Sequence, residues 1–191
     1  MHTGVYWSPS RLVFYVGVFM LSRSMLALVG LFLLFSSVSC DAREHAAGGG
    51  GSASGNGNAP NFVLKTSSGK EIELQKLSGK VVVVNFWATW CGPCRAEIPG
   101  MLEVYAKYKE KGLEIVGISL DQSGWRVINP FVERMKITYP VVWDRGEVAQ
   151  AYGGIRAIPT TFIIDRDGNV VKRHMGYLSK EAFEQVLQQY I

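Results

Sequence analysis

Hydrophobic and polar positions predict alternating strands and helices over most of the 191-residue chain. Residues 81–87 (VVVVNFW) are nearly all β-branched or aromatic, which is typical of a strand buried on both faces of a sheet. Apolar residues then recur at helical spacing over 92–111, and Pro99 within this run predicts a kink. Gly112 is suited to end this helix.

The downstream pattern continues this alternation and ends in an amphipathic helix capped by Ser179. Further strands are expected at 62–65, 71–74, 114–120, 140–143, 160–165 and 170–174, and further helices at 125–136 and 147–152. The first two strands would form a hairpin, and Asp167-Gly168 is a strong turn signal between the last two. We therefore predict one three-layer α/β domain over residues 61–191.

The front of the chain carries two apolar runs, LVFYVGVFML and LALVGLFLLF, separated by Arg23. Each run is about half of the roughly 20 residues that a membrane-spanning helix needs. The second run is typical of the apolar centre of a signal peptide. One uncut membrane helix over 12–35 is the alternative, although a charge inside it is disfavoured by several kcal/mol. A third interpretation is that translation starts later, at Met20 or Met25. All three predict export of the remaining chain.

Cys40 directly follows the second apolar run, in the sequence Ser37-Val38-Ser39-Cys40. This stretch resembles the cleavage box of bacterial lipoproteins, except that Ser37 stands where that box favours leucine. We expect residues 1–40 to form a signal peptide or membrane anchor, with Cys40 as the lipidated residue. An incidental cysteine beside an uncut helix is the alternative. Residues 41–60 are rich in Gly, Ser, Ala and Asn, which predicts a flexible tether.

Charge bears on the possible partners of the chain. The chain has 20 Lys and Arg against 16 Asp and Glu, a formal net charge of +4. The basic residues form no block, so the sequence gives no support to nucleic-acid binding.

Cys91 and Cys94 lie where the buried strand ends and the first long helix begins. Unpaired backbone N–H groups and the helix dipole stabilise a thiolate at such a helix N-terminus. We expect Cys91 to be open to solvent and to act as the attacking thiolate. Cys94, one turn later, would be better buried and act as the resolving thiol. Gly92 permits a tight turn, and Pro93 suits an early helical position.

Two other roles are known for a CxxC pair, namely a structural zinc site and a structural disulfide. A structural zinc site needs four ligands, but the chain has three cysteines and three histidines without suitable spacing. A purely structural disulfide would contribute only about 2 kcal/mol, because the loop between Cys91 and Cys94 is so short. If Cys40 carries lipid, these two cysteines form a closed pair. We therefore predict a redox-active disulfide, with no metal and no separate cofactor.

Residues 81–99 (VVVVNFWATWCGPCRAEIP) and 153–171 (GGIRAIPTTFIIDRDGNVV) together resemble thioredoxin-fold proteins. More narrowly, the chain resembles the membrane-tethered thiol–disulfide oxidoreductases of the TlpA and ResA type. The resemblance extends over about residues 60–191. It implies a thioredoxin-like α/β/α sandwich with a mixed central sheet, an N-terminal β-hairpin, and an inserted helix and strand around 122–144.

The resemblance also implies roles for single residues. Pro159 would be a cis-proline facing the two sulfurs, and the alternative is a proline that simply begins a strand. The Ile158 backbone would pair with an extended substrate. Glu97 would move protons near the sulfurs, and the alternative is an exposed carboxylate of the first helical turn. Thioredoxin has an aspartate where this chain has Asn85, so Glu97 is the one nearby base that the sequence offers.

The remaining implied substrate contacts are Trp90, Gly92 and Pro93, which surround the pair. The predicted function is that of an exported thiol–disulfide oxidoreductase, tethered on the extracytoplasmic side of a bacterial membrane. The Gly-Pro dipeptide favours a reductant near about −270 mV over an oxidant near about −120 mV. The partners of the protein would be proteins with disulfides or CxxC thiols, such as apocytochrome c, and a membrane electron donor.

Two alternative functions stay open at this point. One is a peroxiredoxin-like thiol peroxidase. Thr89 lies two residues before Cys91, as that family's motif requires, but the motif's upstream proline is missing from the strand. The other is a redox-inactive binding or assembly adaptor built on the same fold.

Overall fold

The computed structural model describes residues 57–191. The predicted signal peptide, Cys40 and most of the tether lie outside the described residues. Within the range predicted as tether, the Ala59 N–H donates to the Gly168 carbonyl at 2.9 Å, and Asn58 bridges to Asn169. No helix among residues 57–191 is both long and apolar enough to cross a membrane.

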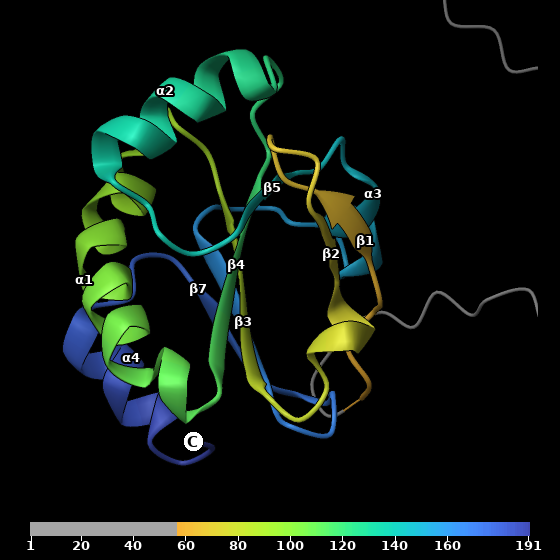
Figure 1. Ribbon diagram of the computed structural model, residues 1–191, viewed down its shortest axis with the longest axis vertical. Coiled ribbons are helices and arrows are strands. Elements are labelled where there is room, and N and C mark those ends of the chain that lie inside the picture. The colour runs from red at the N-terminus through yellow and green to blue at the C-terminus, as the bar shows by residue number, and fades with distance from the viewer. Residues whose placement is uncertain (1–56) are drawn as a thin grey trace, which may run out of the picture. The chain divides into compact units, whose positions relative to one another are not determined.

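The centre of the domain is a mixed five-stranded sheet, as predicted (Figure 1). Its strands, in spatial order, are β5 (Val141–Trp143), β4 (Leu113–Ser119), β3 (Val81–Trp87), β6 (Thr160–Ile164) and β7 (Val170–Met175). β3, β4 and β5 run parallel, whereas β6 and β7 are antiparallel to their neighbours. The carboxyl ends of the three parallel strands therefore meet at one edge of the sheet.

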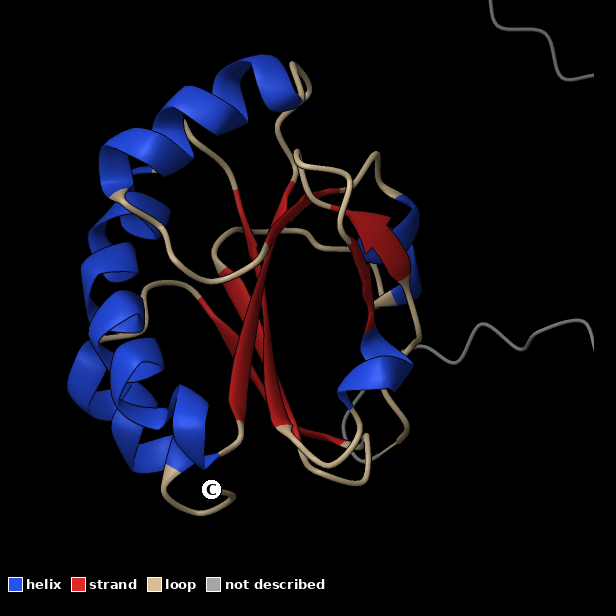
Figure 2. Cartoon of the chain, in the orientation of Figure 1, coloured by secondary structure: helices blue, strands red, loops and turns tan. Residues whose placement is uncertain are grey.

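Helices cover one face of this sheet, and a hairpin with a short helix covers the other (Figure 2). The first layer consists of α1 (Gly92–Tyr108), α2 (Trp125–Met135) and α4 (Lys180–Leu187). The second consists of β1 (Val63–Lys65), β2 (Glu71–Glu73), the 3₁₀ turn η1 (Leu74–Leu77) and α3 (Glu147–Ala151). This is the predicted thioredoxin-like three-layer sandwich with its N-terminal hairpin.

Strand β3 is buried on both faces, which explains its unbroken apolar sequence. Alternate side chains enter the two cores, with Val81, Val83 and Trp87 on the α1 side and Val82, Val84 and Phe86 on the α3 side. On the α3 side, Tyr152 packs edge-on against Phe86 and Phe162, with ring centroids 5.4 and 5.0 Å away. Both layers are thus fixed through the strand that leads to the cysteines.

Helix α1 continues through Pro99 without a break, although it ends three residues earlier than predicted. Residues 109–111 form a separate 3₁₀ turn, η2, which ends at Gly112 with a φ of 96°. A residue in this left-handed region is usually glycine because it has no Cβ. Gly112 therefore ends the 3₁₀ turn η2, whereas the sequence predicted that it would end the long helix itself.

The inserted segment contributes helix α2 and edge strand β5, as predicted. Gly124 precedes α2 with a φ of 57°, and a Cβ there would lie 2.9 Å from the Trp143 ring. A side chain at this position would therefore clash, and the close packing fixes the start of α2 against the end of β5.

Candidate active site

The two cysteines of the CGPC motif form a disulfide at the carboxyl end of β3. Cys91 is the N-cap of α1, and the Cys94 N–H donates to Cys91 Sγ at 3.2 Å. Gly92 and Pro93 between them are exposed. The first sulfur thus receives a backbone N–H at the positive end of a helix, which is an environment that stabilises a thiolate.

The expectation that Cys91 is open to solvent is wrong. Cys91 is only 5% exposed and Cys94 is fully buried, so Cys94 is still the better buried of the two. The loop before β6 accounts for this, because the Ile158 carbonyl oxygen lies 3.6 Å from Cys91 Sγ. Beside the pair, Trp90 is 69% exposed and gives the rim of the site an apolar surface.

The Ile158–Pro159 peptide bond is cis, as the family resemblance implied. Pro159 is buried, and its carbonyl accepts a hydrogen bond from the Gly176 N–H at 2.8 Å. The segment that follows β7 is thereby fixed beside the Ile158–Pro159 loop. The structure thus brings residues 91, 158 and 176 together from three distant parts of the sequence.

Glu97 is buried, with 3% of its surface exposed, so the alternative of an exposed first-turn carboxylate is wrong. It accepts hydrogen bonds from Asn85 Nδ2 at 2.8 Å and from the Leu178 N–H at 3.2 Å. Burial raises the pKa of Glu97 to about 7, although both hydrogen bonds act in the opposite direction. A carboxyl group with this pKa can take up or release a proton near neutral pH.

Comparison with known proteins places this site in a family. The sequence pattern of the AhpC/TSA family matches residues 56–173. The thiol–disulfide oxidoreductase ResA of Bacillus anthracis is 45% identical over 130 residues, which cover 68% of this chain and 75% of that protein. The chain belongs to the AhpC/TSA family and, within it, to the ResA-type thiol–disulfide oxidoreductases. Its enzymatic class is therefore thiol–disulfide oxidoreductase.

Solved structures agree with this ResA-type assignment. A thiol:disulfide interchange protein of the thioredoxin family from Chlorobium tepidum is 36% identical, with a TM-score of 0.65, and covers 71% of this chain and 97% of its own. The exposed lipoprotein thioredoxin of Streptococcus pneumoniae is 27% identical, with a TM-score of 0.61. The match covers 68% of this chain and 99% of that protein's chain. The thioredoxin-like fold is thus shared with named thiol–disulfide exchange proteins.

Two members of the hydrogen-bond network around Glu97 in this ResA-type site, Thr161 and Leu178, were not predicted from the sequence. Asn85 Nδ2 also contacts Thr161 Oγ1, at 3.0 Å, so Thr161 helps to orient the amide. Leu178 contributes only its backbone, for which the sequence holds no signal. The register of β3 against β6 pairs Asn85 with Thr161 directly, so the second threonine of the Pro-Thr-Thr sequence was the one available clue.

Asp121 was also missed. This aspartate is 2% exposed and accepts hydrogen bonds from the Thr89 N–H at 2.9 Å and from Thr89 Oγ1 at 2.7 Å. Ser119 Oγ donates to it as well, at 2.8 Å. Asp121 follows β4, and the carboxyl ends of parallel strands are common places for functional residues, which was the available signal.

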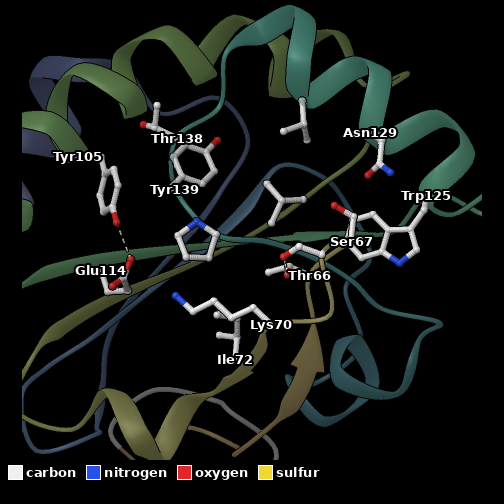
Figure 3. A pocket seen from close by; sticks show the side chains of 14 residues that line it. Thr66, Ser67, Lys70, Ile72, Tyr105, Glu114, Trp125, Asn129, Thr138 and Tyr139 are labelled. Carbon is white, nitrogen blue, oxygen red and sulfur yellow. Dashed lines mark hydrogen bonds between the residues drawn. The ribbon is translucent and has the colours of Figure 1, made fainter.

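A pocket of about 350 Å³ lies apart from the sulfurs, between the β1–β2 turn and α2 (Figure 3). Thr66, Ser67 and Lys70 approach it from the turn, and Tyr105 donates a hydrogen bond to Glu114 at 2.8 Å on its far side. None of the predicted site residues lines it. Among residues 57–191, no three His, Cys, Asp or Glu side chains are grouped to hold a metal ion.

Proposed function

We propose that this protein is an exported, membrane-tethered reductase of protein disulfides that works through Cys91 and Cys94. The observation that carries the proposal is the disulfide at the N-terminus of α1, with the Cys94 N–H directed at Cys91 Sγ. Buried Glu97 on the same helix supplies a group that titrates near neutral pH.

The first step is an attack by the Cys91 thiolate on a substrate disulfide. A new bond forms between Cys91 Sγ and one substrate sulfur, and the other substrate sulfur leaves as a thiolate. The Cys94 N–H and the helix N-terminus stabilise the negative charge on Cys91 before the attack. Ile158, whose carbonyl lies 3.6 Å from Cys91 Sγ, would pair with an extended substrate strand.

The second step releases the substrate. Cys94 must lose its proton before it attacks Cys91 Sγ, and Glu97 lies three residues further along α1, on the same side of the helix. Glu97 takes this proton, the Cys94–Cys91 bond forms, and the second substrate sulfur leaves. Two electrons have then passed to the substrate, and the enzyme is left with its own disulfide.

The surface around the pair supports a polypeptide substrate. Clusters of exposed large apolar side chains often mark interaction sites. Three such side chains belong to segments beside the disulfide: Trp90 (69% exposed), Met175 (62%) and Tyr177 (52%). The last two belong to the segment that Gly176 attaches to the Pro159 carbonyl. Such a rim suits an apolar stretch of a partly unfolded protein.

The cellular setting is part of the proposal. The relative from Streptococcus pneumoniae is named a lipoprotein, which supports lipidation at Cys40 and a catalytic domain outside the cytoplasm, in the cell envelope. Exported proteins with CxxC thiols, such as apocytochrome c, would be the substrates. A membrane protein would return electrons to the Cys91–Cys94 disulfide.

A redox titration against glutathione, combined with insulin reduction, tests this function. We expect a potential near about −270 mV, and loss of insulin reduction in both Cys91→Ser and Cys94→Ser. A potential near about −120 mV would reverse the direction of electron flow. Hydrogen peroxide turnover without insulin reduction would identify a peroxidase. Full cellular function in both cysteine variants would identify a redox-inactive adaptor.

A further inference from the structure

We propose that Asp121 is a positioning residue, whose buried carboxylate holds Thr89 and thereby keeps Trp90 and Cys91 in the arrangement that thiol–disulfide exchange needs. The inference rests on the proposed role of Cys91 as the attacking thiolate. It adds a residue that belongs to neither the CGPC motif nor the Ile158–Pro159 loop. It also gives the inserted segment a part in catalysis.

The contacts of Asp121 are those of a clamp. Its Oδ2 accepts from the Thr89 N–H and from Ser119 Oγ, and its Oδ1 accepts from Thr89 Oγ1. Among residues 57–191, no lysine, arginine or histidine forms an ion pair with it. These three hydrogen bonds therefore offset the free-energy cost of burying the carboxylate. Losing any of them leaves a buried polar atom unpaired.

The clamp fixes the short connection between β3 and α1. Within the described residues, Asp121 provides the only side-chain hydrogen bonds to residues 88–90. The Cys91 N–H in turn donates to the Ala88 carbonyl at 3.2 Å. Among the described residues, Asp121 is thus the one side-chain hydrogen-bond partner of the loop that sets the place of Cys91 at the helix N-terminus.

The inserted segment binds the backbone of Asp121 and of the neighbouring Ser119. Trp143 Nε1 donates to the Asp121 carbonyl oxygen at 2.9 Å, and the Asp144 N–H donates to the Ser119 carbonyl at 3.0 Å. Gly124 lies so close to the Trp143 ring that no Cβ fits between them. The packing of α2 on β5 therefore fixes the carboxylate, and through it the catalytic loop.

A loosened loop would move Cys91 Sγ away from the Cys94 N–H and from the end of the helix dipole. The thiolate would then be less stable, and Cys91 would react more slowly at neutral pH. The charge of Asp121 is not what matters in this account. An asparagine can keep both roles, because its oxygen can accept from the Thr89 N–H and Ser119 while its amide donates to Thr89 Oγ1.

Alkylation of the reduced full chain with iodoacetamide tests the proposal, with mass spectrometry reporting the modified cysteine. The rate at pH 7 and its pH profile are measured for Asp121→Ala and Asp121→Asn. We expect Asp121→Ala to slow Cys91 alkylation about fivefold and to move the profile to higher pH. The rate of Cys91 alkylation in Asp121→Asn should stay within about twofold of the wild-type rate. Equal losses in both variants would overturn the proposal, since charge would then be responsible.

Thr89 and Asp144 supply the second pair of variants and the control. Thr89→Val removes the hydroxyl contact with little change in volume and should slow alkylation of Cys91. Thr89→Ser keeps the hydroxyl and should keep the alkylation rate of the wild type. These variants keep the test decisive if Asp121→Ala does not fold. Asp144 is also buried and binds two backbone N–H groups, those of Val148 and Ala149, at the start of α3.

Asp144→Ala removes these side-chain contacts but keeps the backbone N–H that binds the Ser119 carbonyl. It should therefore lower the free energy of unfolding and leave Cys91 alkylation unchanged. An equal slowing in Asp144→Ala would show that lost stability alone is responsible, and the proposal would fail. Alkylation that begins at Cys94 in the wild type would instead contradict the proposed role of Cys91. The two failures are thus distinguishable.

Discussion

Glu97→Gln should change how the stability of the protein depends on pH. The pKa of Glu97 is about 7 in the folded protein because the carboxyl is buried, against 4.5 in the unfolded chain. Below pH 4.5 both states hold the proton. Between pH 4.5 and 7 the folded state keeps a proton that the unfolded state has lost, so stability falls as the pH rises. The loss is complete once the pH is well above 7, where the folded protein has also released the proton.

The difference between the two pKa values sets the magnitude. Each unit corresponds to about 1.4 kcal/mol, so the wild type should lose about 3 kcal/mol between pH 4 and pH 8 through this one group. A glutamine cannot titrate, and the Asn85 amide can turn its oxygen toward it. The free energy of unfolding of Glu97→Gln, relative to the wild type, should therefore rise by about 3 kcal/mol over this range.

Urea unfolding of the oxidised full chain at several pH values measures this difference. Glu110→Gln is the matched control, because its carboxylate is 88% exposed and meets water in both states. Its difference from the wild type should stay level across the range. A level difference for Glu97→Gln as well would refute the argument, since the buried carboxyl would then titrate no differently from one in water.

Two further substitutions follow from the same contacts. Asn85→Asp would put a second carboxyl group about where the amide now lies, 2.8 Å from Glu97. The two carboxyl groups would share a proton, so the pH–rate profile of insulin reduction should shift to higher pH by about one unit or more. An unchanged profile would show that Glu97 takes no part in the rate-limiting step. Gly124→Ala should lower the free energy of unfolding by more than about 1 kcal/mol, because strain at positive φ adds to a clash with Trp143. Gly69→Ala, at a φ of 84° with open space around it, has the strain alone and should cost less; equal losses would refute the clash.

Features set by local sequence could be predicted. Strand 81–87 has the predicted bounds because a run of β-branched and aromatic residues has few other stable conformations. Helix α1 was predicted from its spacing, and its end was misplaced by the three residues that form a 3₁₀ turn. The cysteines lie at the predicted strand-to-helix boundary because only a short connection separates β3 from α1 in the sequence.

Features set by distant residues could not be predicted from periodicity. Cys91 is covered by Ile158, 67 residues further along the chain, so its burial was missed. The sequence allowed two interpretations of Glu97 because the burial of this side chain depends on Asn85 and Leu178, which other elements supply. Asp121 was missed because it lies 32 residues from Thr89. The cis bond at Pro159 was expected only through the family resemblance.

The most direct test of the account is a trapping experiment with Cys94→Ser in the cells that make the protein. Without the resolving thiol, Cys91 should retain its substrates as mixed disulfides, and mass spectrometry should find exported proteins with paired cysteines attached to Cys91. The same adducts should be missing from Cys91→Ser. Adducts that form on Cys94 in Cys91→Ser, with none on Cys91 in Cys94→Ser, would reverse the roles of the two sulfurs and contradict the account.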